Sequence, residues 1–332
     1  MSKAYQVVGI GNALVDVLAP VEDAFLAEAG VEKGIMTLID TARAVDLYGR
    51  MGPAREVSGG SAANTIAGIA ALGGRTAYVG KVRDDQLGAI FAHDLRAQGA
   101  AYRTPLAPKS HPAETGRCMV MVSPDGERSM STYLGVSEFL APDDIDEAEM
   151  AAADWIFLEG YRFDGPDSIA AFEKAIRATK TAGGRVGVTL SDPFCVERHR
   201  AEFLRMIGAD VDLLVANEHE LRSLYQTEDL EAAMARAAAE VPITACTVGA
   251  KGAYVLSGGE RVHAPAVSGA RVVDVTGAGD LFAAGLLHGL TSGRDFTTSA
   301  RMGCVAAGEI IGHIGARPEA DLRALFAADG LL

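Results

Sequence analysis

The sequence has few cysteines and no long hydrophobic stretch. Its four cysteines are widely separated and form no CxxC pair, so neither a zinc knuckle nor a disulfide framework is predicted. They are Cys118, Cys195, Cys246 and Cys304. No run of about 18 apolar residues, the length that spans a bilayer, is present. The N-terminal segment turns glycine-rich before the apolar core of a signal peptide could form. We therefore expect a cytoplasmic protein that is neither exported nor inserted into a membrane.

Basic residues are also scarce. The formal net charge is −14, whereas nucleic acids and anionic membrane surfaces are bound by basic faces, so we expect neither as a partner. Any phosphate must therefore be bound by local groups. Hydrophobic residues make up 49% of the 332 residues, enough to form a large core. We expect a single globular domain over residues 1–332.

Several common site motifs are absent or incomplete. "GIGNAL" follows the first strand-like run, but Leu14 occupies the third glycine position of a dinucleotide-binding fingerprint. No GxxxxGK[ST] phosphate-binding loop, HExxH zinc motif or GxSxG nucleophile elbow occurs. These absences disfavour a nicotinamide-dependent dehydrogenase, a Walker-type ATPase, a zinc peptidase and an α/β-hydrolase.

Short β-branched runs alternate with longer amphipathic or alanine-rich runs. This alternation predicts βαβ units around a mostly parallel sheet. The expected strands are residues 5–10, 77–80, 155–159, 185–190, 212–216 and 243–248. Two of the expected crossover helices lie within residues 84–99 and 167–184, and each segment ends at glycine.

Two segments interrupt the βαβ rhythm. Residues 15–51 contain short strand-like pieces, and residues 115–135 read as two strands around a Pro-Asp-Gly turn. We interpret them as a small β-rich lid formed by residues 13–50 and 100–137, with the α/β core formed by the remainder. A single domain with surface decorations is the alternative.

The segment "DVTGAGD", residues 274–280, opens an apolar helical run. Gly277, Ala278 and Gly279 are small enough for close approach, and the backbone amides at a helix start form an anion hole. Asp280 lies in the first turn, where we expect the helix field to keep its carboxylate ionised. Such a carboxylate can accept the proton of a hydroxyl that attacks a phosphoryl group. On this segment alone, Asp280 could equally be an acid that only stabilises the helix start.

Polar residues at other strand ends and helix starts could join this segment. Ligands gather at the carboxyl ends of the strands in open α/β sheets, so these residues can converge on one crevice. They are Asp16, Gly59, Gly60, Ser61, Asn64, Asn217, Glu220, Thr247, Gly249 and Gly252. Each glycine cluster alone is more often a tight turn, but their order along the chain is informative.

The ordered motifs "GGSAAN", "NEHE", "TVGAKG" and "DVTGAGD" resemble those of the ribokinase-like (pfkB) carbohydrate and nucleoside kinases over nearly the whole chain. "GIGNALVDVLAPVEDAFL", "TLSDPF" and "VDLLVANEHE" are most similar to adenosine kinases within that family. The resemblance implies a three-layer α/β/α fold with a β-rich lid. It also implies ATP and Mg²⁺ as cofactors.

The resemblance assigns roles residue by residue. It makes Asp280 the catalytic base, with Gly277, Ala278 and Gly279 as the anion hole and Arg128 reaching the transferred phosphate from the lid. The expected acceptor-binding residues are Asn12, Asp16, Gly59, Gly60, Ser61 and Asn64, with Tyr161, Met36 and Met130 around a nucleobase. The expected ATP-binding residues are Asn217, Glu220, Thr247, Gly249 and Gly252, with Cys304 in the helix behind that pocket. Glu220 would organise Mg²⁺ through water, although Asn217 and Glu220 are also ordinary helix caps.

Asp274 has two interpretations. In ribokinase-like enzymes this aspartate and nearby backbone carbonyls enclose a monovalent cation such as K⁺. The matching positions here are Asp274, Thr276, Ile310, His313 and Gly315. Alternatively, Asp274 caps the loop through backbone hydrogen bonds alone.

The expected reaction is ATP-dependent phosphorylation of the 5′-hydroxyl of a ribonucleoside, with adenosine favoured. Tyr161 stands where many adenosine kinases have a phenylalanine, and methionines adapt to other rings, so inosine or guanosine is an alternative. A sugar kinase for ribose, fructose or a related sugar is another. A protein on this scaffold that binds nucleosides without catalysis is disfavoured, because the base, the anion hole and the Asn-Glu pair are all present. The sequence does not distinguish a monomer from a homodimer.

Overall fold

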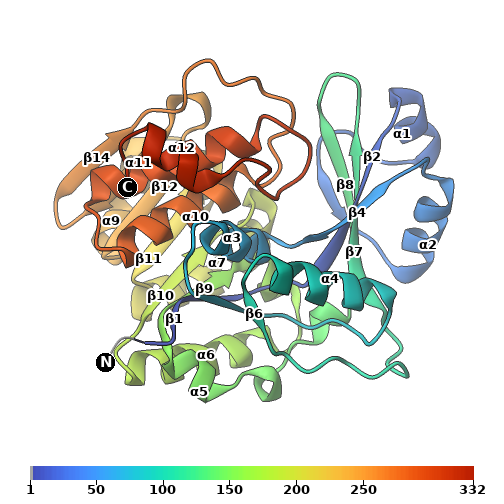
Figure 1. Ribbon diagram of the computed structural model, residues 1–332, viewed down its shortest axis with the longest axis horizontal. Coiled ribbons are helices and arrows are strands. Elements are labelled where there is room, and N and C mark those ends of the chain that lie inside the picture. Colours follow the sequence, from blue (N-terminus) through green and yellow to red (C-terminus); the bar gives the residue numbers. More distant parts are fainter. Residues whose placement is uncertain (1–2) are drawn as a thin grey trace.

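The computed structural model describes residues 3–332, which form a large sheet between two layers of helices and a small second sheet at one side (Figure 1). The large sheet has nine strands in the order β14-β13-β12-β11-β10-β9-β1-β5-β6. Its parallel part comprises β1 Tyr5–Ile10, β5 Thr76–Val79, β6 Ala101–Tyr102, β9 Ala153–Glu159, β10 Arg185–Thr189, β11 Leu213–Asn217 and β12 Ile243–Thr247. An antiparallel hairpin, β13 Ala253–Ser257 and β14 Glu260–Ala264, extends one edge.

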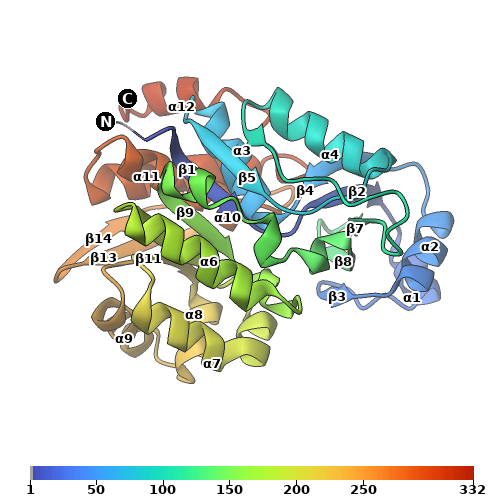
Figure 2. The ribbon, with the colours of Figure 1, turned by 90° about the horizontal axis from the view of Figure 1, so that it is seen from below.

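Helices cover both faces of the large sheet (Figure 2). One layer contains α3 Ser61–Ala71, α4 Gln86–Ala97, α10 Ala278–Thr291, α11 Phe296–Ile310 and α12 Leu322–Ala328. The other contains α5 Glu147–Ala151, α6 Ser168–Thr181, α7 Pro193–Ala209, α8 Glu218–Tyr225 and α9 Leu230–Glu240. Adjacent residues of one strand enter opposite cores: Val7 packs in the first and Val8 in the second. Because parallel strands are buried on both faces, they read as continuous apolar runs, and this made them predictable.

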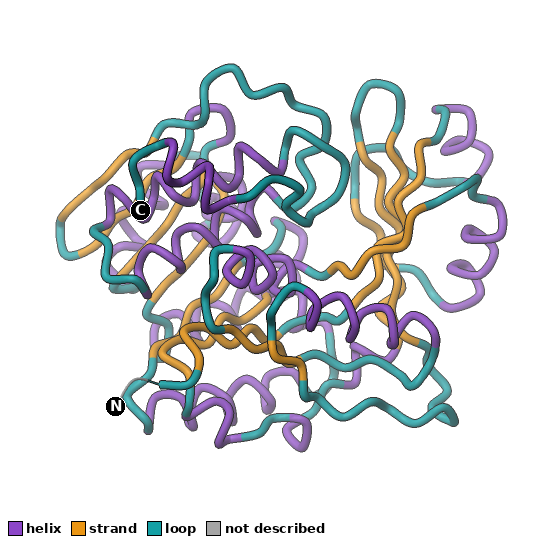
Figure 3. Tube along the Cα trace, in the orientation of Figure 1, coloured by secondary structure: helices purple, strands orange, loops and turns teal. Residues whose placement is uncertain are grey.

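The small sheet has five strands in the order β3-β8-β7-β2-β4 (Figures 1 and 3). They are β2 Leu14–Pro20, β3 Met36–Leu38, β4 Arg55–Gly59, β7 Thr115–Val122 and β8 Arg128–Gly135. Two helices, α1 Asp23–Ala29 and α2 Thr41–Arg50, cover one face of this sheet. The opposite face turns toward the large sheet, with Asp16, Cys118 and Met130 around a cavity.

All six expected strands of the large sheet are present, each within two residues of its predicted bounds, as is the hairpin of residues 115–135. The strand β4 lies outside the expected range 13–50, and β6, inside the range 100–137, belongs to the large sheet. The helices α1 and α2 were not predicted. The closure of this unit as a lid stays a prediction. Within residues 3–332, no helix combines the length and the apolar character needed to cross a membrane.

Candidate active site

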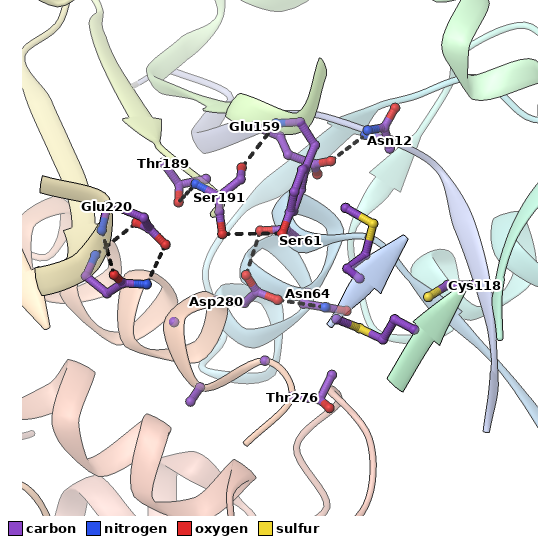
Figure 4. Close-up of a pocket in the computed structure, with 18 of the residues that line it drawn as sticks. Asn12, Ser61, Asn64, Cys118, Glu159, Thr189, Ser191, Glu220, Thr276 and Asp280 are labelled. Atoms are coloured by element: carbon purple, nitrogen blue, oxygen red, sulfur yellow. Dashed lines mark hydrogen bonds between the residues drawn. The ribbon is translucent and has the colours of Figure 1, made fainter. Parts of the chain in front are cut away.

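A cavity of about 470 Å³ lies where the small sheet faces the carboxyl ends of the large sheet's strands. It brings together most of the residues that the sequence pointed to, from segments more than 200 residues apart (Figure 4). These are Asn12, Asp16, Met36, Gly60, Ser61, Asn64, Arg128, Met130, Tyr161, Asn217, Glu220, Thr247, Gly249, Thr276, Gly277, Ala278, Gly279 and Asp280. The predicted convergence on one crevice is therefore observed.

Asp280 is held by three hydrogen bonds from helix α3. Ser61 Oγ donates to Oδ1 over 2.6 Å, and Asn64 Nδ2 donates to Oδ2 over 2.8 Å (Figure 4). Thr65 Oγ1 donates to the Asp280 backbone carbonyl over 3.1 Å. Ser61 and Asn64, which were expected to bind the acceptor, thus also contact the expected base. The buried Oδ1 of Asn64 has no partner within residues 3–332 and remains able to accept a hydrogen bond.

The electrostatics of Asp280 differ from the sequence-based expectation. Burial raises the pKa of this carboxyl, although the hydrogen bonds from Ser61 and Asn64 and the charges of Arg317 and Arg128 act in the opposite direction. The prediction considered the helix field and not the desolvation of a carboxyl that lines a cavity. A raised pKa makes the carboxylate a stronger proton acceptor, as general base catalysis requires.

The backbone before α10 provides an anion hole of fewer amides than predicted. Gly277 caps the helix with φ of 76°, which favours glycine, and Ala316 packs where its Cβ would lie. Within residues 3–332, the amides of Gly277 and Gly279 have no protein acceptor. The amide of Ala278 donates to the Val275 carbonyl over 3.2 Å, so it is not free as expected. Two outward amides at a helix start still suit a phosphate oxygen.

Asp16 faces the cavity from β2. Burial raises the pKa of its carboxyl to about 7, the charge of Arg317 opposes this shift, and the nearby charge of Asp280 adds to it. Gly59 lies against the carboxylate on the neighbouring strand β4, and any Cβ there would collide with it. The carboxylate of Asp16 is available to two hydroxyl donors of a ligand, since it accepts no hydrogen bond from residues 3–332.

Asn12 is oriented by residues that the sequence analysis missed. Its Oδ1 accepts hydrogen bonds from Arg162 Nη1 over 3.2 Å and from Ser137 Oγ over 3.3 Å. This assignment directs Nδ2, a donor, toward the cavity that Asn12 lines. Arg162 is 1% exposed. It lies three residues beyond the end of the Ala153–Glu159 strand, where polar residues often serve a site, and that position was its only signal in the sequence.

Glu159 is a second residue that was missed. It is 1% exposed, accepts from the Asn12 amide over 3.2 Å and from the Ala62 amide over 2.9 Å, and so joins the end of β1 to the start of α3 (Figure 4). Burial raises its pKa to about 7, although both amides counteract this shift. Its place at the last position of a buried strand was the available signal.

Asn217 and Glu220 form a capping box at the start of α8. Asn217 Oδ1 accepts from the Glu220 amide over 2.9 Å, and Glu220 Oε2 accepts from the Asn217 amide over 2.9 Å. Burial raises the pKa of Glu220 to about 7. The pair therefore serves as an ordinary cap, while Glu220 also lines the cavity, so its role toward Mg²⁺ stays a prediction.

The apolar wall of the cavity comes from the small sheet. Met36 and Met130 are register partners on the neighbouring strands β3 and β8, and Leu38 beside them is 42% exposed. Tyr161 faces the cavity, and its hydroxyl donates to the Ser191 carbonyl over 3.4 Å. Arg128 begins β8 and lines the cavity half-buried, without an ion pair in residues 3–332.

A second cavity of about 390 Å³ adjoins the first. Both are lined by Thr247, Gly249 and Gly279, and the second adds Gly252 and Cys304. Cys304 is 5% exposed and its thiol pKa is raised to about 11 by burial, so the thiol is inert. The two cavities meet at the start of α10, beside Asp280.

Asp274 lies behind the site and lines neither cavity. Its Oδ1 accepts from the Thr276 amide over 2.9 Å, and its Oδ2 accepts from the Gly315 amide over 3.0 Å. The expected loop-capping geometry is thus present. Ile310 ends α11, and the His313 side chain turns to Glu309 at 3.1 Å. Residues 3–332 contain no cluster of three or more His, Cys, Asp or Glu side chains that could hold a metal ion. This finding concerns side chains only and does not cover a site formed by backbone carbonyls.

Comparisons with known proteins agree with this geometry. The model of the pfkB family carbohydrate kinases matches residues 34–322. The structure of a probable sugar kinase from Rhizobium etli is 46% identical, with a TM-score of 0.95 and coverage of 99% of this chain and 100% of that one. The adenosine kinase from Sinorhizobium meliloti is 47% identical, with a TM-score of 0.93 and the same coverage. The adenosine kinase of Saccharomyces cerevisiae is 27% identical, over 92% of this chain and 94% of that protein.

Proposed function

We propose a nucleoside as the acceptor substrate of this chain, which belongs to the pfkB family of carbohydrate kinases and is therefore a phosphotransferase acting on a hydroxyl group. The proposed acceptor is the 5′-hydroxyl of a ribonucleoside, with adenosine favoured. One observation carries the proposal. Asp280 is fixed by Ser61 and Asn64 where the acceptor-side cavity, with its apolar wall, meets the second cavity at the start of α10.

The arrangement of polar and apolar groups supports a nucleoside acceptor. Asp16 and the free Oδ1 of Asn64 accept hydrogen bonds from ribose hydroxyls, and Asn12 donates one. The methionine wall of Met36 and Met130 then packs against a base. A free pentose or hexose would leave this wall exposed to water, which disfavours a small sugar.

In the proposed reaction, Asp280 accepts the proton of the 5′-hydroxyl as that oxygen attacks the terminal phosphoryl group of ATP, the bond from that phosphorus to the bridging oxygen breaks, and ADP leaves. The amides of Gly277 and Gly279 donate to the oxygens of the group in transit, where charge develops. Arg128, on the small sheet, adds positive charge from the opposite side. Closure of the small sheet over the cleft would exclude water, so that ATP is not hydrolysed.

The residues present fit ATP and Mg²⁺. The nucleotide would occupy the second cavity, between Gly252 and Cys304, with its phosphates directed to the α10 start. Mg²⁺ prefers oxygen ligands and retains waters, and Glu220 lines the first cavity, into which the terminal phosphate would extend. When bound, Mg²⁺ would neutralise phosphate charge and orient the phosphate chain.

The substrate assignment is tested by a panel of acceptors with ATP. We expect adenosine to give the highest kcat/KM, at least about 100-fold above ribose and fructose, because only a nucleoside has a base that can pack against the apolar wall. 5′-Deoxyadenosine is the matched control, since it keeps base and diol but lacks the acceptor oxygen. It should inhibit competitively without consuming ATP. A higher kcat/KM for fructose or ribose would instead support the sugar kinase alternative. The similar Rhizobium etli protein is described as a probable sugar kinase, which favours that alternative.

We further propose that a monovalent cation such as K⁺ binds beside Asp274. This carboxylate is 1% exposed and has no lysine, arginine or histidine nitrogen within 4.0 Å among residues 3–332, so its charge is not paired. A cation held by carbonyls of the neighbouring loop would balance it and steady Thr276 and Gly277. We expect kcat to be several-fold higher in K⁺ than in tetramethylammonium at equal ionic strength. Equal rates in the two salts would rule out the requirement.

A further inference from the structure

Arg317 is a half-buried arginine that takes no direct part in the proposed reaction. Its guanidinium donates from all three nitrogens to the junction of β4 and α3. Nε and Nη2 donate to the carbonyl and the hydroxyl of Ser58, over 3.0 and 3.2 Å, and Nη1 donates to the Ala63 carbonyl over 2.6 Å. This junction carries Ser61 and Asn64, the two side chains that hold Asp280.

The residues before Arg317 contact the segment that precedes Asp280 in the chain. The Gly315 amide donates to Asp274, and Ala316 packs directly against Gly277 at the anion hole. Three consecutive residues, 315–317, therefore connect the segment that precedes α10 with the segment that precedes α3. Asp280 is in the first turn of α10 and is held by side chains of α3, so the relative position of the two helix starts determines where the expected base stands.

Arg317 also compensates an excess of negative charge. Asp16, Glu159 and Glu220 are near enough to Asp280 for the charges to act on one another. Asp274 acts in the same way on Asp16, and Tyr78 and Asp94 act on Arg317. Arg317 and Arg128 are the two cations that favour the charged forms of Asp16 and Asp280, and Arg317 has the larger effect on both. Arg317 has no carboxylate within 4.0 Å among residues 3–332 and does not line the cavity, so it acts through the low-dielectric interior and not by touching substrate.

We propose that Arg317 is a positioning residue of the phosphoryl-transfer site, which ties the start of α3 to the start of α10 and supplies the positive charge that allows Asp16 and Asp280 to be ionised together. The inference rests on the proposed function, because it takes Asp280 as the proton acceptor and Asp16 as the ligand of the acceptor's hydroxyls. It predicts that the charge and the fork geometry of Arg317 have separable effects.

The pH dependence of kcat/KM separates the two effects. Activity needs both carboxylates ionised, so kcat/KM falls as pH decreases through their pKa values; this falling part of the profile is its acid limb. Removing a nearby positive charge raises those pKa values and therefore moves the acid limb to higher pH. For Arg317→Gln we expect a shift of about one pH unit upward and a loss of at least about tenfold in kcat/KM at pH 7. For Arg317→Lys, which keeps the charge but not the three-point fork, we expect slower turnover with the acid limb unmoved. An unmoved limb in Arg317→Gln, or equal shifts in both variants, would overturn the proposal.

Two further variants complete the experiment. Ser58→Ala removes one acceptor of the fork and keeps the charge, so turnover should fall with the limb in place, and unchanged turnover would contradict the positioning role. Arg55→Gln is the matched control, because Arg55 begins β4, is 70% exposed and lies 3.7 Å from Glu319 near the same loop. It should behave like the parent protein in rate and in pH profile.

Thermal unfolding without substrate provides a second readout. Asp16 and Asp280 have raised pKa values in the folded protein, so stability falls as pH rises through the window above their unfolded values. Arg317→Gln should steepen the loss of Tm between pH 6 and pH 8.5, whereas Arg317→Lys should not. A parent protein inactive on every acceptor would refute the proposed function and leave this readout to decide the inference. Parallel Tm curves for the two variants would contradict it.

Discussion

Replacing Asp280 with asparagine is expected to lower kcat by about 10³-fold, with a much smaller change in KM for the acceptor. Asparagine keeps the shape of the side chain and can still contact Ser61, which lies 2.6 Å from the carboxylate. It cannot accept the proton of the attacking hydroxyl. The loss should therefore fall on the chemical step, and steady-state kinetics with saturating ATP will measure it.

The same substitution tests the alternative that Asp280 only stabilises a helix start. In that case Asp280→Asn would cost about 0.3–1 kcal/mol of stability and leave kcat nearly unchanged. We expect the reverse. The pKa of Asp280 is raised by burial, so the charged carboxylate lowers stability above that pKa, and removing the charge should leave Tm at pH 8 unchanged or higher. Asp295→Asn is the control, because Asp295 caps the neighbouring helix α11 by accepting from the Thr298 amide, and asparagine caps equally well. Turnover of Asp280→Asn within tenfold of the parent would sink the assignment.

Replacing Asp16 with asparagine is expected to change activity and stability in opposite directions. A charged acceptor facing two hydroxyls contributes about 1.5–3 kcal/mol per hydrogen bond, so kcat/KM should fall by about 10²–10⁴-fold. Substrates that lack the 2′- and 3′-hydroxyls should show a much smaller difference between variant and parent. That comparison assigns the loss to the diol and not to general damage.

The stability of the Asp16→Asn protein should rise at neutral pH. The pKa of Asp16 is raised to about 7, so its stabilising contribution is present below pH 3.8 and is lost as pH increases from 3.8 to 7. At pH 8 the parent thus holds a buried charge that the variant lacks, and we expect a gain of about 2 kcal/mol, or several degrees in Tm. Near pH 5 the gain should largely vanish. A variant that is less stable than the parent at pH 8 would show that Asp16 stabilises the fold, which the structure does not indicate.

Much of the fold could be predicted from local patterns. The parallel strands are buried on both faces, so each appears as a short β-branched run, and the hairpin of residues 115–135 is marked by its Pro-Asp-Gly turn. The strand β6 has only two residues, and β4 is largely polar, so neither leaves a clear pattern. The hairpin of β13 and β14 does carry a local signal, the pair Gly258 and Gly259 in the turn between the two strands.

The sequence could predict which residues line the site but not which of them contact one another. Glycine-rich helix starts and polar strand ends are local features, and their order along the chain indicated a phosphate-binding crevice with Asp280 at its centre. The partners of Asp280 are 216 and 219 residues away, and Arg317 reaches Ser58 across 259 residues, distances over which no periodicity carries information. Burial raises the pKa values of Asp16, Glu159 and Glu220 to about 7, and burial exists only once the layers have packed. The sequence by itself determined which elements form and which groups can bind phosphate, because helix starts and strand ends are specified by neighbouring residues. Only the tertiary structure decided which charges face one another and which are removed from water, because those depend on the packing of segments far apart in the chain.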